Sequence, residues 1–449
     1  MSGLFSKETR AEIALRPGEL RIVLLAAAYF FVVLAAWFMV RPVREQLGIA
    51  GGVWDLRWLF LVTWAVMLLL QPLYGRAVAV FPRRVFVPLV YVVAGGSFLL
   101  FFLGMQGLGE DDQLWLGRGF YVWSSVVNLW IVAVFWSYMA DHVSSERAKR
   151  LYPWIAVGGT LGAIAGGLVA KGALAIAGDM GGDELADKAV AWLLPASALL
   201  LFLVPVFVSR LHRALADSEE ALGLKGAGPA APIGGSAWAG LRELVRSPYM
   251  LRISVLALGY SLTSTLLYFA QADIVNAAFD SRAERTEAFA VIDIITQSLT
   301  LFVQVFLTRR FISSLGLGKT LAILPVIAGA SLVAVWLFPV FGVIAATQAV
   351  RRASSYAIAK PTREVLFSVL SREDKYKAKA AIDTFVYRTG DALGAMTSMG
   401  LKAVAPALAA VVWLGLPITV VWTAVALRLG RDHAERSHET PRGDGDETA

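Results

Sequence analysis

The chain has 449 residues, of which 57% are hydrophobic and only 17% are charged, and its formal net charge is +7. A soluble domain carries about a quarter charged residues. The deficit, together with repeated apolar runs of about twenty residues, predicts a polytopic membrane protein. The chain lacks cysteine and has four histidines, all outside the apolar runs, so neither a metal site nor a bound cofactor is expected.

The apolar runs predict an all-α fold of about twelve transmembrane helices. The polar start of the chain, residues 1–19, has no short apolar core followed by a cleavage site, so we do not expect a cleaved signal peptide. The predicted spans are 20–40, 57–74, 86–104, 118–140, 153–176, 190–209, 250–271, 287–308, 319–338, 341–362, 379–401 and 405–428.

The distribution of basic residues predicts the orientation in the membrane. With both termini in the cytoplasm, cytoplasmic segments hold about 28 of the 41 Lys and Arg residues and outer segments hold about 9, as the positive-inside rule requires. The basic balance is therefore explained by topology, and the expected partner is the lipid bilayer rather than a nucleic acid.

A Gly/Pro/Ala-rich stretch, "GLKGAGPAAPIGGS", predicts a flexible linker that divides the chain into two halves. The tail from Arg428 is polar, and we expect it to be disordered. The predicted segments are a cytoplasmic start (1–19), a six-helix bundle (20–210), a cytoplasmic linker with a short amphipathic helix (211–249), a second six-helix bundle (250–428) and a cytoplasmic polar tail (429–449).

Internal similarity supports two related halves. "GGTLGA" at 158–163 and "GDALGA" at 390–395 share four of six positions, and small residues spaced by four allow two helices to pack closely. The alternative interpretation is helix packing without duplication. Two halves of six spans resemble the layout of major facilitator transporters. The predicted helix-packing residues are Gly158, Gly162, Gly166, Gly390 and Gly394.

An enzyme is not expected. "SSLGLGKT" at 313–320 fits part of the phosphate-binding loop pattern, but Ser313 stands where the first glycine belongs and no strand precedes it. Without this loop, a histidine cluster or a cysteine, the sequence offers no catalytic constellation.

Two further segments resemble the ATP/ADP translocases of intracellular bacteria and plastids. One is the Leu129-Trp130 pair with the following "AKRLYP" at 148–153, and the other is "KYKAKAAID" at 375–383. The resemblance implies nucleotide exchange in a bacterial cytoplasmic membrane. It places Arg44 and Glu45 where that family has Lys and Asp, and Asn128 where it has a glutamate.

Span ten contains adjacent cations, Arg351 and Arg352, and an ionisable residue inside a span is a functional candidate. Adjacent side chains of a helix point about 100° apart, so we expect one to face the solute and the other an acid such as Asp293 or Asp391. The alternative is that both are structural ion-pair members. Lys360 is expected at the cytoplasmic mouth, or as a residue that snorkels to the interface.

The remaining charges in spans also allow two interpretations. Arg388 and Asp391 are spaced to pair on one helical face, although direct contact with the solute is an alternative. Asp293 is a candidate proton carrier, or a counter-ion for a cation in span ten or eleven. Arg41 and Arg44 share a face near the outer end of span one, where they would line the path or anchor the helix at the interface.

Cations outnumber acids in the spans, and guanidinium groups bind phosphate or carboxylate. The sequence therefore predicts a monomeric secondary transporter that works by alternating access on a small anion such as a nucleotide. The alternatives are a proton-coupled carrier of another organic ion and a non-transporting sensor. The candidate solute-binding residues are Arg44, Asn128, Arg351, Arg352, Lys360 and Arg388, and the candidate gating or charge-pair residues are Arg41, Glu45, Asp293, Arg363, Glu364, Lys379, Asp383 and Asp391.

Overall fold

The computed structural model describes residues 19–107, 109–143, 145–221, 246–370, 382–402 and 407–439. Within these ranges every regular element is a helix, which confirms the all-α prediction. Nine helices in the described ranges are long and apolar enough to cross a membrane.

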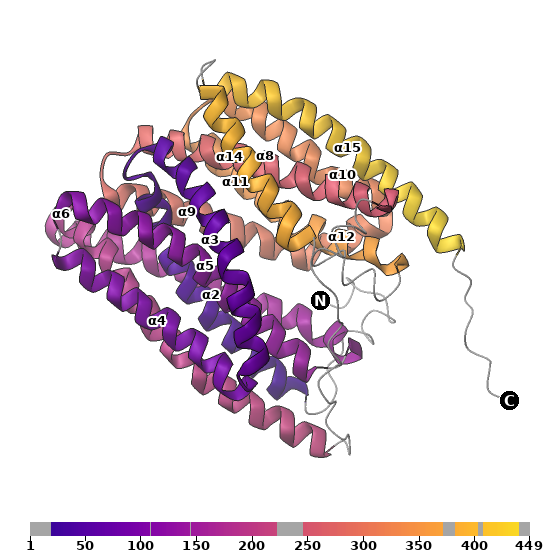
Figure 1. The fold of residues 1–449 in the computed structure, drawn as a ribbon, viewed down its shortest axis with the longest axis horizontal. Coiled ribbons are helices and arrows are strands. Elements are labelled where there is room, and N and C mark those ends of the chain that lie inside the picture. Colours follow the sequence, from indigo (N-terminus) through magenta and orange to yellow (C-terminus); the bar gives the residue numbers. More distant parts are fainter. Residues whose placement is uncertain are drawn as a thin grey trace. The chain divides into compact units, whose positions relative to one another are not determined.

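The elements follow one another from the N-terminus, and Figure 1 labels the α-helices among them. They are α2 (Glu19–Ile49), α3 (Val53–Val80), α4 (Arg83–Gly107), α5 (Glu110–His142), α6 (Ser145–Ala221), α8 (Pro248–Ala278), α9 (Arg282–Phe306), α10 (Thr308–Leu337), α11 (Phe341–Ser354), η1 (Ser355–Ala359), α12 (Lys360–Leu366), η2 (Phe367–Val369), η3 (Ile382–Val386), α14 (Tyr387–Lys402) and α15 (Ala407–Glu439).

Two of these elements bear on the predicted number of spans. Helix α6 has 77 residues and covers both 153–176 and 190–209, with a break at Gly181 and Gly182, where Gly182 has a φ of 67°. Predicted span ten corresponds to α11, η1 and α12, where a π-helical segment interrupts the α-helix. The number of twelve spans therefore stays a prediction.

The chain packs as two compact units. Unit 1 combines Met1–Ala231 with Phe279–Ser298, and unit 2 combines Pro232–Ala278 with Leu299–Ala449. Helix α9 therefore begins in unit 1 and ends in unit 2. Its first part, which the sequence places in the C-terminal bundle, packs with the N-terminal helices.

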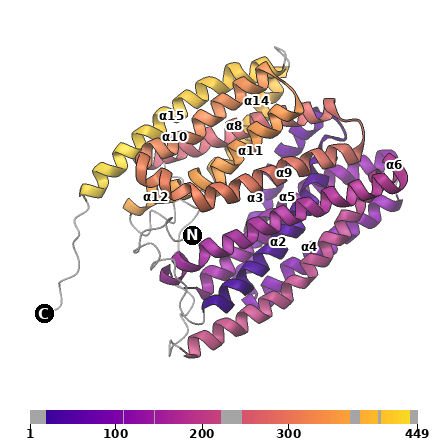
Figure 2. The same cartoon turned by 180° about the vertical axis from the view of Figure 1, so that it is seen from behind.

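Helix α2 is the centre of unit 1. It packs against α5 and α6, and α4 packs against the same two helices (Figure 2). The close approach of α6 depends on glycine: a Cβ at Gly158 would lie 2.7 Å from the Cβ of Ala27, and one at Gly162 would collide with the backbone oxygen of Phe31. Gly166 meets the backbone of Ala35 in the same way.

In unit 2, α8 packs against α14 and α15, and α10 packs against α15. Glycine again permits the contact between α8 and α14. A Cβ at Gly390 would lie 2.6 Å from the Cβ of Ser261, and one at Gly394 would lie 2.8 Å from the Cβ of Thr265. Here the glycines meet side chains rather than backbone.

Helix α15 continues to Glu439, so the disorder predicted from Arg428 onward is wrong for residues up to Glu439. The extension is held to α8 by an ion pair between Arg252 and Asp432 at 2.5 Å and by the guanidinium of Arg436 over the ring of Tyr249. These long-range contacts have no local signal in the tail.

The predicted linker is only partly described. Helix α6 continues to Ala221, so the first residues after 210 are helical rather than part of a flexible segment. The Gly/Pro/Ala-rich stretch and most of the predicted amphipathic helix lie outside the described residues.

The segment similar to a phosphate-binding loop lies within α10. Gly316 breaks the helix with a φ of 73°. Gly318 lets α10 approach α15, because a Cβ there would lie 3.1 Å from the backbone oxygen of Leu427. These glycines serve helix packing.

Candidate solute-binding site

Unit 1 contains a charged cluster on α2, α5 and α9. Arg41 donates from Nη1 to Oδ1 of Asp293 at 2.8 Å, and its Nε lies 3.8 Å from Oε1 of Glu45. The two carboxylates are buried, with 3% of Asp293 and 4% of Glu45 exposed. The sequence had suggested a partner for Asp293 in span ten or eleven, and the structure pairs it with Arg41 of α2.

Arg44 belongs to the same cluster. It donates from Nη1 to Oε1 of Glu45 at 2.7 Å and from Nε to Oγ of Ser125 at 3.0 Å. Its guanidinium carbon lies 4.1 Å from the ring centroid of Tyr121. Arg41 and Arg44 therefore have carboxylate partners, and their charge is compensated by the protein itself.

Arg351 in unit 2 has a different environment. Its side chain is buried, with 5% exposed. It donates from Nε and Nη2 to Oε1 of Gln348 at 3.2 and 2.7 Å, and from Nη1 to Oγ of Ser264 at 2.5 Å. The hydroxyl of Tyr260 is a further uncharged neighbour. Among the described residues, all of its hydrogen-bond partners are therefore uncharged.

Asp391 holds α14 against α8. It accepts from Oγ of Ser261 at 2.5 Å and from Oγ1 of Thr265 at 3.4 Å. Arg388 lies 3.5 Å from its other oxygen, at the i,i+3 spacing that predicted a pair. About a third of each side chain is exposed, 33% of Arg388 and 31% of Asp391. This carboxylate compensates Arg388 and anchors two helices.

The other cations of span ten lie in different surroundings. Arg352 is buried, whereas Lys360 is exposed with Nζ 4.6 Å from the ring centroid of Tyr356. Arg363 donates a hydrogen bond to the hydroxyl of Tyr387 and lies 3.6 Å from Glu364. Arg351 is therefore distinguished from Lys360 by burial and from Arg363 by the charge of its partner.

In unit 2, both Arg351 and Arg388 lie close in sequence to a π-helical turn. The segment η1 begins four residues after Arg351, and η3 ends two residues before Arg388. Such turns widen a helix locally and are frequent at functional sites. The π-helical turn η1 therefore interrupts the α-helix of span ten about one turn after the buried Arg351.

Three predicted residues make no described contact with the charged cluster of unit 1 or with Arg351 and Asp391 of unit 2. Asn128 of α5 is half-buried and has no hydrogen-bond partner in the described part of the chain. Lys379 lies outside the described residues, and Asp383 is placed in η3 by its backbone alone.

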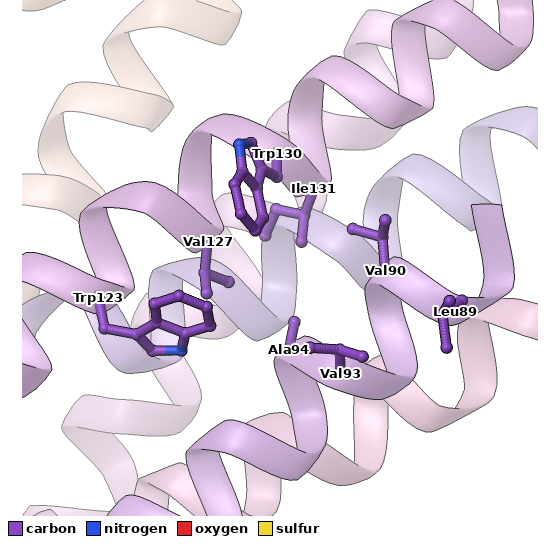
Figure 3. Close-up of a pocket in the computed structure, with 8 residues that line it drawn as sticks. All are labelled: Leu89, Val90, Val93, Ala94, Trp123, Val127, Trp130 and Ile131. Carbon is purple, nitrogen blue, oxygen red and sulfur yellow. The ribbon is translucent and has the colours of Figure 1, made fainter. Parts of the chain in front are cut away.

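A cavity of about 160 Å³ lies between α4 and α5 in unit 1 (Figure 3). Its walls are apolar side chains, including Val93 of α4 and Trp123, Val127 and Trp130 of α5. It has no cation for a charged solute. Within the described residues, no cluster of three or more His, Cys, Asp or Glu side chains is arranged to hold a metal ion.

Comparison with protein families places these clusters in a known context. A family model described as "TLC ATP/ADP transporter" matches residues 104–349, more than half of the chain. The chain belongs to the TLC ATP/ADP transporter family. As a TLC family member, the protein is a membrane transporter rather than an enzyme, as the sequence predicted.

Curated relatives of this TLC family member include carriers from Chlamydia. ADP,ATP carrier protein 1 of Chlamydia pneumoniae is 24% identical over 73% of this chain and 69% of that protein. ADP,ATP carrier protein 1 of Chlamydia muridarum is 24% identical over 73% of this chain and 67% of that protein.

Solved structures of transporters share the fold. A bacterial homologue of the iron transporter ferroportin in an inward-facing state gives a TM-score of 0.61 at 14% identity, covering 93% of this chain and 100% of that chain. An auto-inhibited peptide transporter of the POT family gives 0.59 at 12% identity, covering 96% of this chain and 99% of that chain. The major facilitator-like fold predicted from two six-span halves is thereby confirmed.

Sequence reasoning missed the uncharged residues of both clusters. Gln348 precedes Arg351 by three positions, and Ser261 and Thr265 are four apart on α8. Polar residues at helical spacing in apolar spans were a usable signal for these side chains. Ser125, Ser264 and Tyr121 carry no such signal, because side chains with a hydroxyl group are common in membrane helices. Such a hydroxyl can donate a hydrogen bond to a backbone oxygen, so its presence does not indicate a partner on another helix.

Proposed function

We propose that this transporter binds a small anion, a nucleotide, at Arg351 and exchanges ATP for ADP across the membrane by alternating access. The observation that carries the proposal is the buried guanidinium with uncharged partners. A buried cation is costly unless something compensates it, and a phosphate group does so through charge-assisted hydrogen bonds. Similarity to chlamydial ADP,ATP carriers supports a nucleotide as the anion.

Counterflow tests the proposal. Proteoliposomes loaded with ADP should take up labelled ATP with the wild-type protein, and Arg351→Ala should abolish this uptake. Arg431→Gln is the matched control, because it removes an exposed arginine of unit 2 outside the cluster. Uptake that is independent of internal ADP and driven by a proton gradient would replace the proposal with proton-coupled transport.

The same proposal includes solute-binding roles for Arg44, Arg352 and Arg388 as the anion moves between states. In this structure Arg44 and Arg388 are engaged with Glu45 and Asp391. An incoming phosphate would compete with those carboxylates. Arg388→Ala should therefore also abolish nucleotide uptake while the protein still folds, and unchanged uptake in both Arg351→Ala and Arg388→Ala would contradict the proposal.

We place the protein in the cytoplasmic membrane of a bacterium with both termini in the cytoplasm, working as a monomer. The Lys and Arg asymmetry supports the orientation. Reporter fusions at the C-terminus test the orientation, and light scattering of the purified protein tests the monomer. A periplasmic C-terminus or a stable dimer would contradict these assignments.

A further inference from the structure

Gln348 occupies the place that a carboxylate commonly has beside a buried arginine. Its side chain is 2% exposed, and its Oε1 accepts from both Nε and Nη2 of Arg351. Two donors of one guanidinium meet one side chain, as in an arginine–carboxylate pair, and here both converge on a single oxygen. Here the acceptor is an amide oxygen, so the arrangement is retained without the negative charge.

The orientation of this amide is determined by a second helix. Nε2 of Gln348 donates to the backbone oxygen of Leu267 on α8 at 3.2 Å. A flipped amide would direct its N–H groups at the guanidinium of Arg351, which has donors alone. The bond to α8 therefore fixes Oε1 on the side of Arg351 and fixes the guanidinium in turn.

We propose that Gln348 is a positioning residue that sets the charge selectivity of this site. It holds Arg351 in place as a carboxylate would, and leaves the positive charge to be compensated by the transported anion. The inference rests on the proposed role of Arg351 as the anion-binding residue. Unit 1 shows the opposite arrangement, since Arg41 and Arg44 are held by Asp293 and Glu45.

Two substitutions of similar size separate charge from positioning. Gln348→Glu keeps an acceptor for Arg351 but adds a counter-charge, whereas Gln348→Met removes the acceptor and adds no charge. Loss of hydrogen bonds alone should weaken binding of labelled ATP by less than about 10-fold. A built-in carboxylate should weaken it by about 30-fold or more, because it competes with the phosphate for one charge.

A purely structural role for Gln348 predicts the reverse order, with Gln348→Met the weaker binder. The proposal is overturned if Gln348→Glu binds ATP within about 3-fold of the wild type, or if Gln348→Met binds more weakly than Gln348→Glu.

Thermal unfolding without any solute gives a second, independent readout. Gln348→Glu should melt within about 2 °C of the wild type or above it, because the buried cation gains a counter-ion. A variant that fails to fold, or melts well below the wild type, overturns the inference. If the wild type does not bind ATP, the proposed function fails, while this ligand-free measurement still tests whether the charge of Arg351 is uncompensated.

Discussion

Unit 1 and unit 2 each contain an arginine cluster among helices, but the partners of the arginines differ. Arg41 and Arg44 face the carboxylates of Asp293 and Glu45, whereas Arg351 faces an amide and a hydroxyl. A buried arginine in a membrane helix is therefore not by itself a sign of anion binding. The charge of the partner decides whether a solute must compete with a carboxylate for the guanidinium or can compensate its charge directly.

The largest effect on stability is expected from breaking the pair in unit 1. Arg41→Gln removes the cation that pairs with the buried carboxylate of Asp293, which should lower the free energy of unfolding by about 3 kcal/mol. Thermal unfolding in detergent measures the change. A melting temperature equal to that of the wild type would contradict the view that this pair is structural.

Removing both partners sharpens the same comparison. Because Asp293→Asn eliminates the buried carboxylate from which Arg41→Gln removes a cation, the double variant should recover about 1–2 kcal/mol relative to the sum of the single variants. The double-mutant cycle measures this coupling energy. Additive effects would show that the two side chains do not stabilise one another.

The packing glycines should give a smaller difference between the units. Gly162→Ala brings a Cβ onto the backbone of Phe31, whereas Gly394→Ala meets side-chain atoms of Thr265, which adjust at lower cost than a helix backbone. We expect losses of about 2 and about 1 kcal/mol, respectively. Equal melting temperatures for the two variants would contradict the assigned contacts.

The smallest effect is expected at Lys360. Its ammonium is exposed and lies over the ring of Tyr356, an interaction of about 0.5–1 kcal/mol at exposed sites. Lys360→Gln should therefore change stability by less than about 1 kcal/mol and leave exchange measurable. Loss of exchange with intact folding would instead assign Lys360 to the transport path.

The sequence predicted what depends on local pattern. The apolar runs predicted the helices, and small residues at spacing four predicted that helices pack closely at those glycines. The i,i+3 spacing predicted the contact between Arg388 and Asp391. Arg41 and Asp293 are separated by 252 positions, so no periodicity links them. Their pairing depends on how α9 packs against α2.

The partner of Arg351 also depends on a long-range contact that the sequence does not indicate. Gln348 lies one helical turn from Arg351, but its role depends on the carbonyl of Leu267 on α8, which orients the amide. The disorder predicted after Arg428 was wrong up to Glu439 for a similar reason, because contacts with α8 stabilise that end of α15.

Thermal unfolding of Arg351→Gln, with and without ATP, tests the central claim most directly. Without ATP, the variant should melt at or above the wild type, because it removes a buried charge whose hydrogen-bond partners among the described residues are all uncharged. With ATP at about 100 times its dissociation constant, the wild type should gain about 2.7 kcal/mol and the variant should gain nothing. A variant that retains the ATP-induced stabilisation would contradict the assignment of Arg351 as the anion site.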